Sequence, residues 1–323
     1  MKREVTAVYG DCAPTFRRVQ KVLAAAGADI TWDEPSEGAT FSDMLKSAKR
    51  TGLALVGHQR WSGEGLSPAV ALRDELGVYA QHRPVRPLPG IPSRHQDVDL
   101  LVVRETTEDV YAHLEHESLP GVFESLKVTT EESCERIARH AFEVARATGR
   151  DSVTVVHKAN IMKLSDGMFL RVAQRVAASF PEVACNDVIV DALCMKLVLN
   201  PGQFEVLLCG NLFGDIVADL CAGLVGGPSN APSINFSKAG EHGVALFTAG
   251  HGDRRELVGT EHASPLPILV PAMHLLRHIG QEGEAERLHD ATAATLEAGL
   301  RPRAMGGTAT REEICSAIES RLA

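Results

Sequence analysis

The sequence lacks any apolar run that approaches the ~20 residues of a membrane-spanning helix. Its first residues also lack the long apolar region of a signal peptide. The 7 cysteines are scattered, with no CxxC and no zinc-like pairs. Positive charge is in deficit too, since a formal net charge of −9 argues against nucleic-acid or anionic-membrane partners. We therefore expect a protein of the reducing cytoplasm that binds neither nucleic acid nor membranes.

A dinucleotide-binding G-x-G-x-x-G loop is also missing after the first predicted strand, so an ordinary Rossmann fingerprint is absent. What remains is typical of a soluble globular protein, with 44% hydrophobic and 23% charged residues. A chain of 323 residues is longer than one hydrophobic core usually serves. We expect two domains or lobes.

Short apolar runs alternate with amphipathic segments along the chain. The runs predict strands at 5–9, 53–56, 99–103, 153–156, 188–190, 206–209 and 244–247. The amphipathic segments predict helices at 15–26, 131–148, 168–179, 266–279, 284–297 and 311–322. This alternation indicates an α/β fold with a largely parallel sheet. A proline cluster with Gly90 marks a stiff connection at a possible lobe boundary: Pro84, Pro87, Pro89 and Pro92.

An acidic pair stands out in the segment Asn-Leu-Phe-Gly-Asp-Ile-Val-Ala-Asp at 211–219. If Gly214 opens a helix, Asp215 and Asp219 lie on one face, four residues apart. Carboxylates held that close repel unless a cation or a proton intervenes, and a hard cation such as Mg²⁺ or Mn²⁺ suits them. The alternative is two solvated acids at a helix N-terminus, where negative charge is favoured anyway.

Polar residues follow several predicted strands directly. Arg104, Lys158, Asn211 and Asp215 all come just after apolar runs. In open α/β sheets, ligands bind beyond the carboxyl ends of the strands. These residues therefore indicate a ligand site at one edge of the sheet.

Seven blocks resemble the β-decarboxylating dehydrogenases, the family of isocitrate, homoisocitrate, 3-isopropylmalate and tartrate dehydrogenases. They lie in family order at 67–73, 82–86, 103–111, 156–163, 189–191, 210–219 and 306–310. The block Pro-Gly-Val-Phe-Glu-Ser-Leu-Lys at 120–127 is similar to the NAD-linked isocitrate dehydrogenases, and the chain as a whole is closest to these and the homoisocitrate enzymes. The resemblance implies a two-lobed isocitrate/isopropylmalate dehydrogenase-like fold with a discontinuous first domain. Residues 1–92 and 226–323 would form a cofactor-binding lobe, and 93–225 a lobe for dimerisation, metal and substrate.

The resemblance also implies residue roles. The implied metal ligands for Mg²⁺ or Mn²⁺ are Asp215, Asp219 and, from the partner subunit of a homodimer with shared active sites, Asp191. The implied catalytic residues are Tyr111, which would protonate the enolate, and Lys158 from the partner subunit, which would take part in removing the hydroxyl proton. The implied substrate contacts are Ser67, Arg73, Arg83, Arg104, Tyr111, Lys158 and Asp191, and the implied cofactor contacts are His251, Gly252, Glu256, Leu257 and Ser264.

Two loops depart from the family pattern. The first loop reads Gly-Asp-Cys-Ala-Pro at 10–14, where the family has Gly-Asp-Gly-Ile-Gly-Pro, and the cofactor loop at 251–259 is altered as well. Ala69 and Thr106 stand where many members carry asparagine. These departures indicate a changed substrate, a changed cofactor mode, or both. The acid at Glu256 favours NAD because it would repel a 2′-phosphate, while Arg254 and Arg255 leave NADP open.

The chain is therefore expected to be a metal-dependent enzyme for a small-molecule substrate. It would decarboxylate isocitrate or a related 3-substituted malate oxidatively to a 2-oxo acid and CO₂, with reduction of NAD. The alternative is a non-catalytic regulatory subunit of a hetero-oligomeric isocitrate dehydrogenase. The presence of the whole catalytic and metal set disfavours that alternative.

Overall fold

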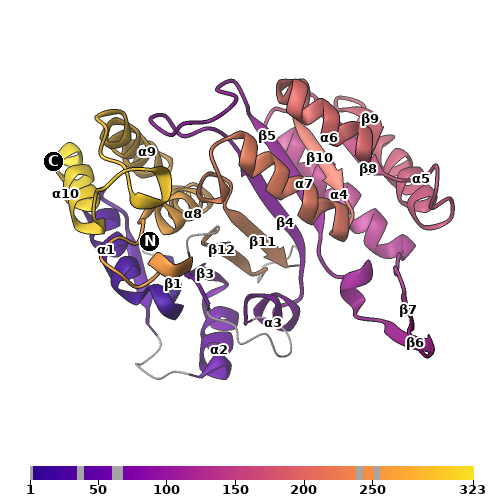
Figure 1. The fold of residues 1–323 in the computed structure, drawn as a ribbon, viewed down its shortest axis with the longest axis horizontal. Coiled ribbons are helices and arrows are strands. Elements are labelled where there is room, and N and C mark those ends of the chain that lie inside the picture. Colours follow the sequence, from indigo (N-terminus) through magenta and orange to yellow (C-terminus); the bar gives the residue numbers. More distant parts are fainter. Residues whose placement is uncertain (1–2, 35–39, 60–67, 238–242, 251–254) are drawn as a thin grey trace. The chain divides into compact units, whose positions relative to one another are not determined.

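The computed structural model describes residues 3–34, 40–59, 68–237, 243–250 and 255–323 (Figure 1). The chain divides into two compact units. Unit 1 comprises Met1–Gly77, Pro87–Gln96 and Val225–Ala323, and unit 2 comprises Val78–Arg86 and Asp97–Leu224. Strands alternate with helices in both, so the α/β class expected from the sequence is confirmed. None of the described helices is long and apolar enough to cross a membrane.

The described residues of unit 1 form five strands with helices packed against them. Their order is β2 (Ile30–Asp33), β1 (Arg3–Val8), β3 (Leu53–Val56), β12 (Ala245–Thr248) and β11 (Ser233–Ser237). All neighbours run parallel except β11 and β12. The helices are α1 (Ala13–Ala25), α2 (Phe41–Thr51), α3 (Pro68–Glu75), α8 (Leu266–His278), α9 (Glu282–Glu297) and α10 (Arg311–Leu322). Phe16, Phe247 and Leu269 lie in the core that these elements enclose.

Unit 2 also contains a five-strand layer. The order is β4 (Val78–Val85), β5 (Leu100–Glu105), β10 (Val206–Cys209), β8 (Ser152–His157) and β9 (Ala184–Ile189), parallel except for β4 against β5. The helices are α4 (Glu131–Ala147), α5 (Ser165–Ala177), α6 (Val190–Leu199) and α7 (Asn211–Leu224). Every residue of β5 and β10 is buried, as is typical of parallel strands covered on both faces. A separate hairpin pairs β6 (Glu115–Leu119) with β7 (Val122–Ser125).

The structure contains elements that the sequence did not predict, namely β2, β4, β6, β7, β11, α2, α3 and α6, and it corrects three expectations. β4 belongs to unit 2, not to the first lobe, because it pairs antiparallel with β5 over Ala80–Val85. The chain consequently passes between the units four times rather than twice. The strand expected at 188–190 is the end of β9, and α6 begins at Val190. Helix α7 begins at Asn211, three residues before the glycine that was expected to open it.

Candidate active site

The carboxyl ends of the strands of unit 2 meet at one edge. Cys209 at the end of β10 is aligned with Arg104 on β5 and with Val156 on β8. His157 on β8 is in turn aligned with Ile189 on β9. The residues that leave these strands therefore start from one line, which is where open α/β sheets bind their ligands.

Arg104 is fixed before any ligand arrives. Its guanidinium is buried and donates to Asn211 Oδ1 from Nε at 3.0 Å and from Nη2 at 2.7 Å. Its Nη1 donates to Gln81 Oε1 at 3.3 Å and forms an ion pair with Asp215. Neutral and charged acceptors thus hold three of its nitrogens, so the planar fork has one orientation.

Gly214 makes room for this arginine. A Cβ at position 214 would lie 2.6 Å from Arg104 Cγ and 2.8 Å from its Cβ. These are atoms close to the backbone of Arg104, so they cannot swing aside as a side-chain tip would. The glycine that the sequence suggested as a helix start instead lets α7 approach β5 closely.

Tyr111 lies against the same carboxylate. Its hydroxyl donates to Asp215 Oδ2 at 2.5 Å, and the guanidinium carbon of Arg104 lies 5.1 Å from the centre of its ring. Burial raises the pKa of Tyr111, and the hydrogen bond to Asp215 raises it further. The phenol therefore keeps its proton at neutral pH.

Asp219 forms an ion pair with Arg83. Arg83 Nη2 lies 3.1 Å from Asp219 Oδ1, while the Asp219 side chain is 76% exposed. Burial lowers the pKa of Arg83. The helical spacing of Asp215 and Asp219 is confirmed, and each acid faces a different guanidinium, which relieves the repulsion that the sequence pattern suggested.

Lys158 and Asp191 form a second pair. Lys158 follows β8, Asp191 lies in the first turn of α6, and Lys158 Nζ lies 2.5 Å from Asp191 Oδ1. The bond to Lys158 lowers the pKa of Asp191. Among the described residues, no three His, Cys, Asp or Glu side chains form a group that could hold a metal ion. Within one chain, Asp191 therefore does not complete a metal site with Asp215 and Asp219.

The other expected site residues belong to unit 1. Arg73 lies in the last turn of α3, and Glu256 and Leu257 lie in a 3₁₀ turn at Arg255–Leu257. Ser264 is buried, and its hydroxyl accepts the backbone N–H of Leu266 at 3.3 Å, at the start of α8. Three expected residues lie outside the described ones: Ser67, His251 and Gly252.

The structure adds residues to the site beyond those that the sequence predicts. Gln81 contacts Arg104 from β4, a strand that the sequence pattern did not reveal. Lys127, Asp109 and Asp166 form a buried ion-pair network beside the Tyr111 loop. Asp109 and Asp166 could have been suspected because they lie within or next to the quoted blocks, whereas no local signal marks Gln81.

Comparisons with known proteins decide the family. The family model described as isocitrate/isopropylmalate dehydrogenase matches residues 24–320. The chain belongs to this family. It is a decarboxylating dehydrogenase that acts on a hydroxy acid, as the sequence blocks predict.

Individual relatives match this chain over almost its whole length. "Isocitrate dehydrogenase [NAD] catalytic subunit 5, mitochondrial" of Arabidopsis thaliana is 41% identical over 93% of this chain and 83% of that protein. "Isocitrate dehydrogenase [NAD] regulatory subunit 1, mitochondrial" of the same plant is 38% identical over 99% of this chain and 90% of that one. The crystal structure of isocitrate dehydrogenase from Methylococcus capsulatus is 33% identical and superposes with a TM-score of 0.89, covering 100% of this chain and 99% of that one.

Proposed function

We propose that the chain is a catalytic enzyme rather than a regulatory subunit. It would decarboxylate isocitrate or a related 3-substituted malate oxidatively, with NAD as the oxidant. The contact between the Tyr111 hydroxyl and Asp215 carries this proposal, because it puts a protonated phenol against a carboxylate suited to a metal. A subunit that had lost its chemistry would not need to retain this arrangement.

The two carboxylates of α7 fit a hard divalent cation. Asp215 and Asp219 offer only oxygen atoms, and their side chains are 47% and 76% exposed, so both are accessible. When bound, Mg²⁺ or Mn²⁺ would polarise the substrate's hydroxyl and keto oxygens and lower the cost of negative charge. A single chain supplies two of the three expected ligands, so we assign Asp191 of the partner as the third.

The chain's own residues would divide the remaining work. Arg104 and Arg83 would hold substrate carboxylates through charge-assisted hydrogen bonds, which are strong because both guanidinium groups are partly desolvated. Lys158 would take part in removing the hydroxyl proton in the partner's site, and Asp191 of the same chain holds its amino group in place. Tyr111 would return a proton to carbon after CO₂ leaves, and its raised pKa keeps that proton on the phenol beforehand.

NAD is the proposed cofactor. The two Arabidopsis relatives are named as subunits of NAD-linked isocitrate dehydrogenase, which supports NAD for this chain. The Glu256 side chain is exposed in unit 1 and carries the charge that would disfavour a 2′-phosphate. The expected cytoplasmic location stays a prediction, and those two relatives are named as mitochondrial.

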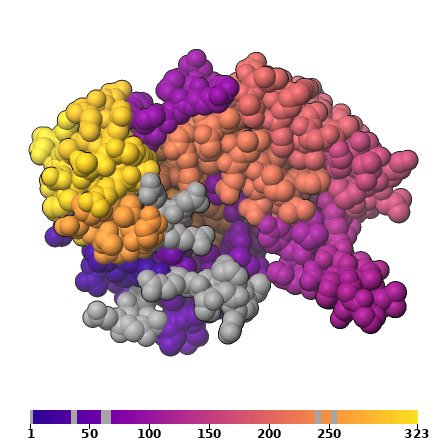
Figure 2. Space-filling view, in the orientation of Figure 1, coloured from indigo at the N-terminus to yellow at the C-terminus, as the bar shows by residue number. Residues whose placement is uncertain are grey.

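A homodimer with shared sites is proposed from the apolar surface of unit 2. All the exposed large hydrophobic residues of the described chain lie in this unit: Leu114, Leu119, Val122, Phe123, Leu126, Ile161, Leu164, Met195, Val198, Leu199 and Ile216. The β6–β7 hairpin, in purple in Figure 2, is exposed at every residue. An isolated two-stranded hairpin is marginal in water, so it needs a partner surface. A second copy of this chain is the proposed partner, because the exposed apolar residues include Ile161, which follows Lys158 closely, and Met195 and Val198 on α6, the helix that carries Asp191.

The regulatory-subunit alternative rests on the similarity to the regulatory relative. It predicts a chain that is inactive alone and gains a role only with a different subunit. Both hypotheses accept the same fold, so activity of the isolated protein separates them.

The test is a panel of 3-substituted malates, including isocitrate, with Mg²⁺ or Mn²⁺ and either NAD or NADP, followed by absorbance of the reduced cofactor. We expect turnover with NAD for at least one substrate and none in excess chelator. Asp219→Asn should abolish turnover and leave the fold intact. No turnover on any substrate, or full activity in chelator, would contradict the proposal.

A further inference from the structure

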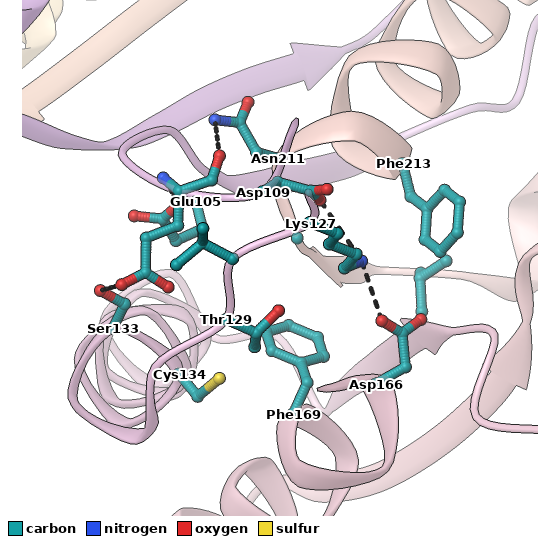
Figure 3. A pocket seen from close by; sticks show the side chains of 14 residues that line it. Glu105, Asp109, Lys127, Thr129, Ser133, Cys134, Asp166, Phe169, Asn211 and Phe213 are labelled. Atoms are coloured by element: carbon teal, nitrogen blue, oxygen red, sulfur yellow. Dashed lines mark hydrogen bonds and ion pairs between the residues drawn. The ribbon is translucent and has the colours of Figure 1, made fainter. Parts of the chain in front are cut away.

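Lys127 lies between the two loops that carry the proposed proton donor and base. Its amino group is 2.8 Å from Asp166 Oδ1 and 3.4 Å from Asp109 Oδ2. Figure 3 draws both ion pairs as dashed lines. Both carboxylates are buried, whereas the Lys127 side chain is 20% exposed. Within the described part of the chain, Lys127 is the cation with which both of them pair.

Asp109 organises the loop of Tyr111. Its backbone has a φ of 75°, a strained value for a residue other than glycine, so the surrounding contacts must hold it there. Its Oδ1 accepts the N–H of Val110 at 2.9 Å, at the start of the 3₁₀ turn that contains Tyr111. Its Oδ2 accepts the N–H of Leu212 at 3.1 Å, in the first turn of the helix that carries Asp215. The Asp109 carboxylate therefore positions both the turn that carries Tyr111 and the helix that carries Asp215, the hydrogen-bond partner of Tyr111.

Asp166 organises the loop of Lys158. It lies in the first turn of α5, and its Oδ2 accepts the backbone N–H of Lys158 at 2.7 Å. Its other oxygen faces the Lys127 amino group. The backbone from which Lys158 extends is thus held by the carboxylate that Lys127 neutralises.

Removing the Lys127 charge would leave two buried carboxylates without a counter-ion. An unpaired buried charge is costly, so the two loops would separate and admit water, or the carboxylates would take up protons. Lys127 is also held above the ring of Phe213 on α7, 5.0 Å from its centre. This contact fixes the position of the lysine relative to the acid-bearing helix.

We propose that Lys127 is a positioning residue that keeps the Tyr111 loop and the Lys158 loop in mutual register through Asp109 and Asp166. The proposal rests on the proposed function, in which Tyr111 serves the site of its own chain and Lys158 that of the partner. A single buried network therefore supports both active sites of the dimer, one through each loop.

Hybrid dimers with one working site test this directly. One subunit carries Lys158→Ala and the other Asp219→Ala, so one site has the first subunit's Tyr111 and the second subunit's Lys158, both intact. Lys127→Met is then added to either subunit. Turnover of the best substrate from the malate panel should fall about 10- to 100-fold in both placements, as expected when reacting groups are displaced by ~1 Å. The KM for that substrate should change less than about threefold, since Arg83 and Arg104 are untouched.

Two isosteric variants should act in one placement each. Asp109→Asn should lower turnover mainly in the subunit that supplies Tyr111, and Asp166→Asn mainly in the one that supplies Lys158. These keep the side-chain shape and so remain informative if Lys127→Met folds poorly. The matched control is Arg150→Met, which removes a cation of 17% exposure from Asp99 near the amino end of β5 in the same unit. It should leave turnover within about twofold.

The outcomes separate the two proposals. If the hybrid with native Lys127 is inactive, the shared site fails, and the two-site role of Lys127 fails with it. If that hybrid is active but Lys127→Met acts in one placement only, or no more than Arg150→Met, the role of Lys127 alone is overturned. Equal effects of Asp109→Asn and Asp166→Asn in both placements would also overturn it.

Discussion

Replacing Tyr111 by phenylalanine removes one oxygen from the candidate site and nothing else. That oxygen donates to Asp215 Oδ2 at 2.5 Å. A positioned general acid contributes about 10²–10⁴-fold to rate. We therefore expect kcat to fall by that factor, which corresponds to about 3–5 kcal/mol in the barrier.

Binding and stability should change much less in Tyr111→Phe. The Asp215 side chain is 47% exposed, so water can replace the lost donor, and a typical hydrogen bond contributes only about 0.5–1.5 kcal/mol to stability. The ring of Tyr111 remains to pack against Arg104. KM should therefore stay within about threefold and the free energy of unfolding within about 1 kcal/mol.

The assay is steady-state turnover under conditions where chemistry limits the rate, with the free energy of unfolding measured by urea. Tyr79→Phe is the matched control, because this buried tyrosine of the same unit bonds to His140 rather than to the site. It should keep turnover within about twofold. If Tyr111→Phe keeps native turnover, Tyr111 is only a packed ring and the assigned role is wrong.

Three further changes test other parts of the structure. Gly214→Ala should lower the free energy of unfolding by about 1–3 kcal/mol and turnover at least tenfold, because the added Cβ would lie 2.6 Å from Arg104. Gly223→Ala in the same helix is the control: its Cβ meets nothing within 4 Å, so stability and turnover should not change. Burial lowers the pKa of His140 to about 4, whereas a histidine of the unfolded chain has a pKa of about 6.5, so at pH values below about 6.5 the unfolded chain binds a proton that the folded chain does not. The free energy of unfolding should therefore be highest above pH 6.5 and fall by about 2 kcal/mol between pH 7 and 5. Urea unfolding at several pH values should find a smaller fall in His140→Gln. Phe123→Asp, in the exposed hairpin, should give monomers without activity in sedimentation and turnover assays, while Ser118→Asp should remain dimeric; a dimeric Phe123→Asp would contradict the proposed interface.

The sequence alone predicted the α/β class and the family, and the reason is local in both cases. Apolar runs such as those of β5, β8 and β10 are visible without any contact, because buried parallel strands are apolar on both faces. The i, i+4 spacing of Asp215 and Asp219 is likewise a property of one helix. Short blocks in a fixed order then identified the chemistry that these residues can perform.

Elements without such a local signal were missed or misplaced. β4 contains Gln81, His82, Arg83 and Pro84, so it reads as a loop until it is seen to pair with β5. α6 follows β9 without a turn, and its apolar start has the pattern of a strand end. In both cases the strand partner, and not the segment itself, decides the structure.

The tertiary structure decided which side chains of the site contact one another. The sequence named Arg104, Tyr111 and Asp215, and only the fold shows that they touch, across 104 to 111 residues of chain. It likewise decided that Gly214 makes room for an arginine and that Lys127 bridges Asp109 and Asp166. Periodicity and motif spacing report on neighbours within one element, whereas these contacts join atoms from separate elements, and their geometry exists only once the sheet has brought the strand ends together.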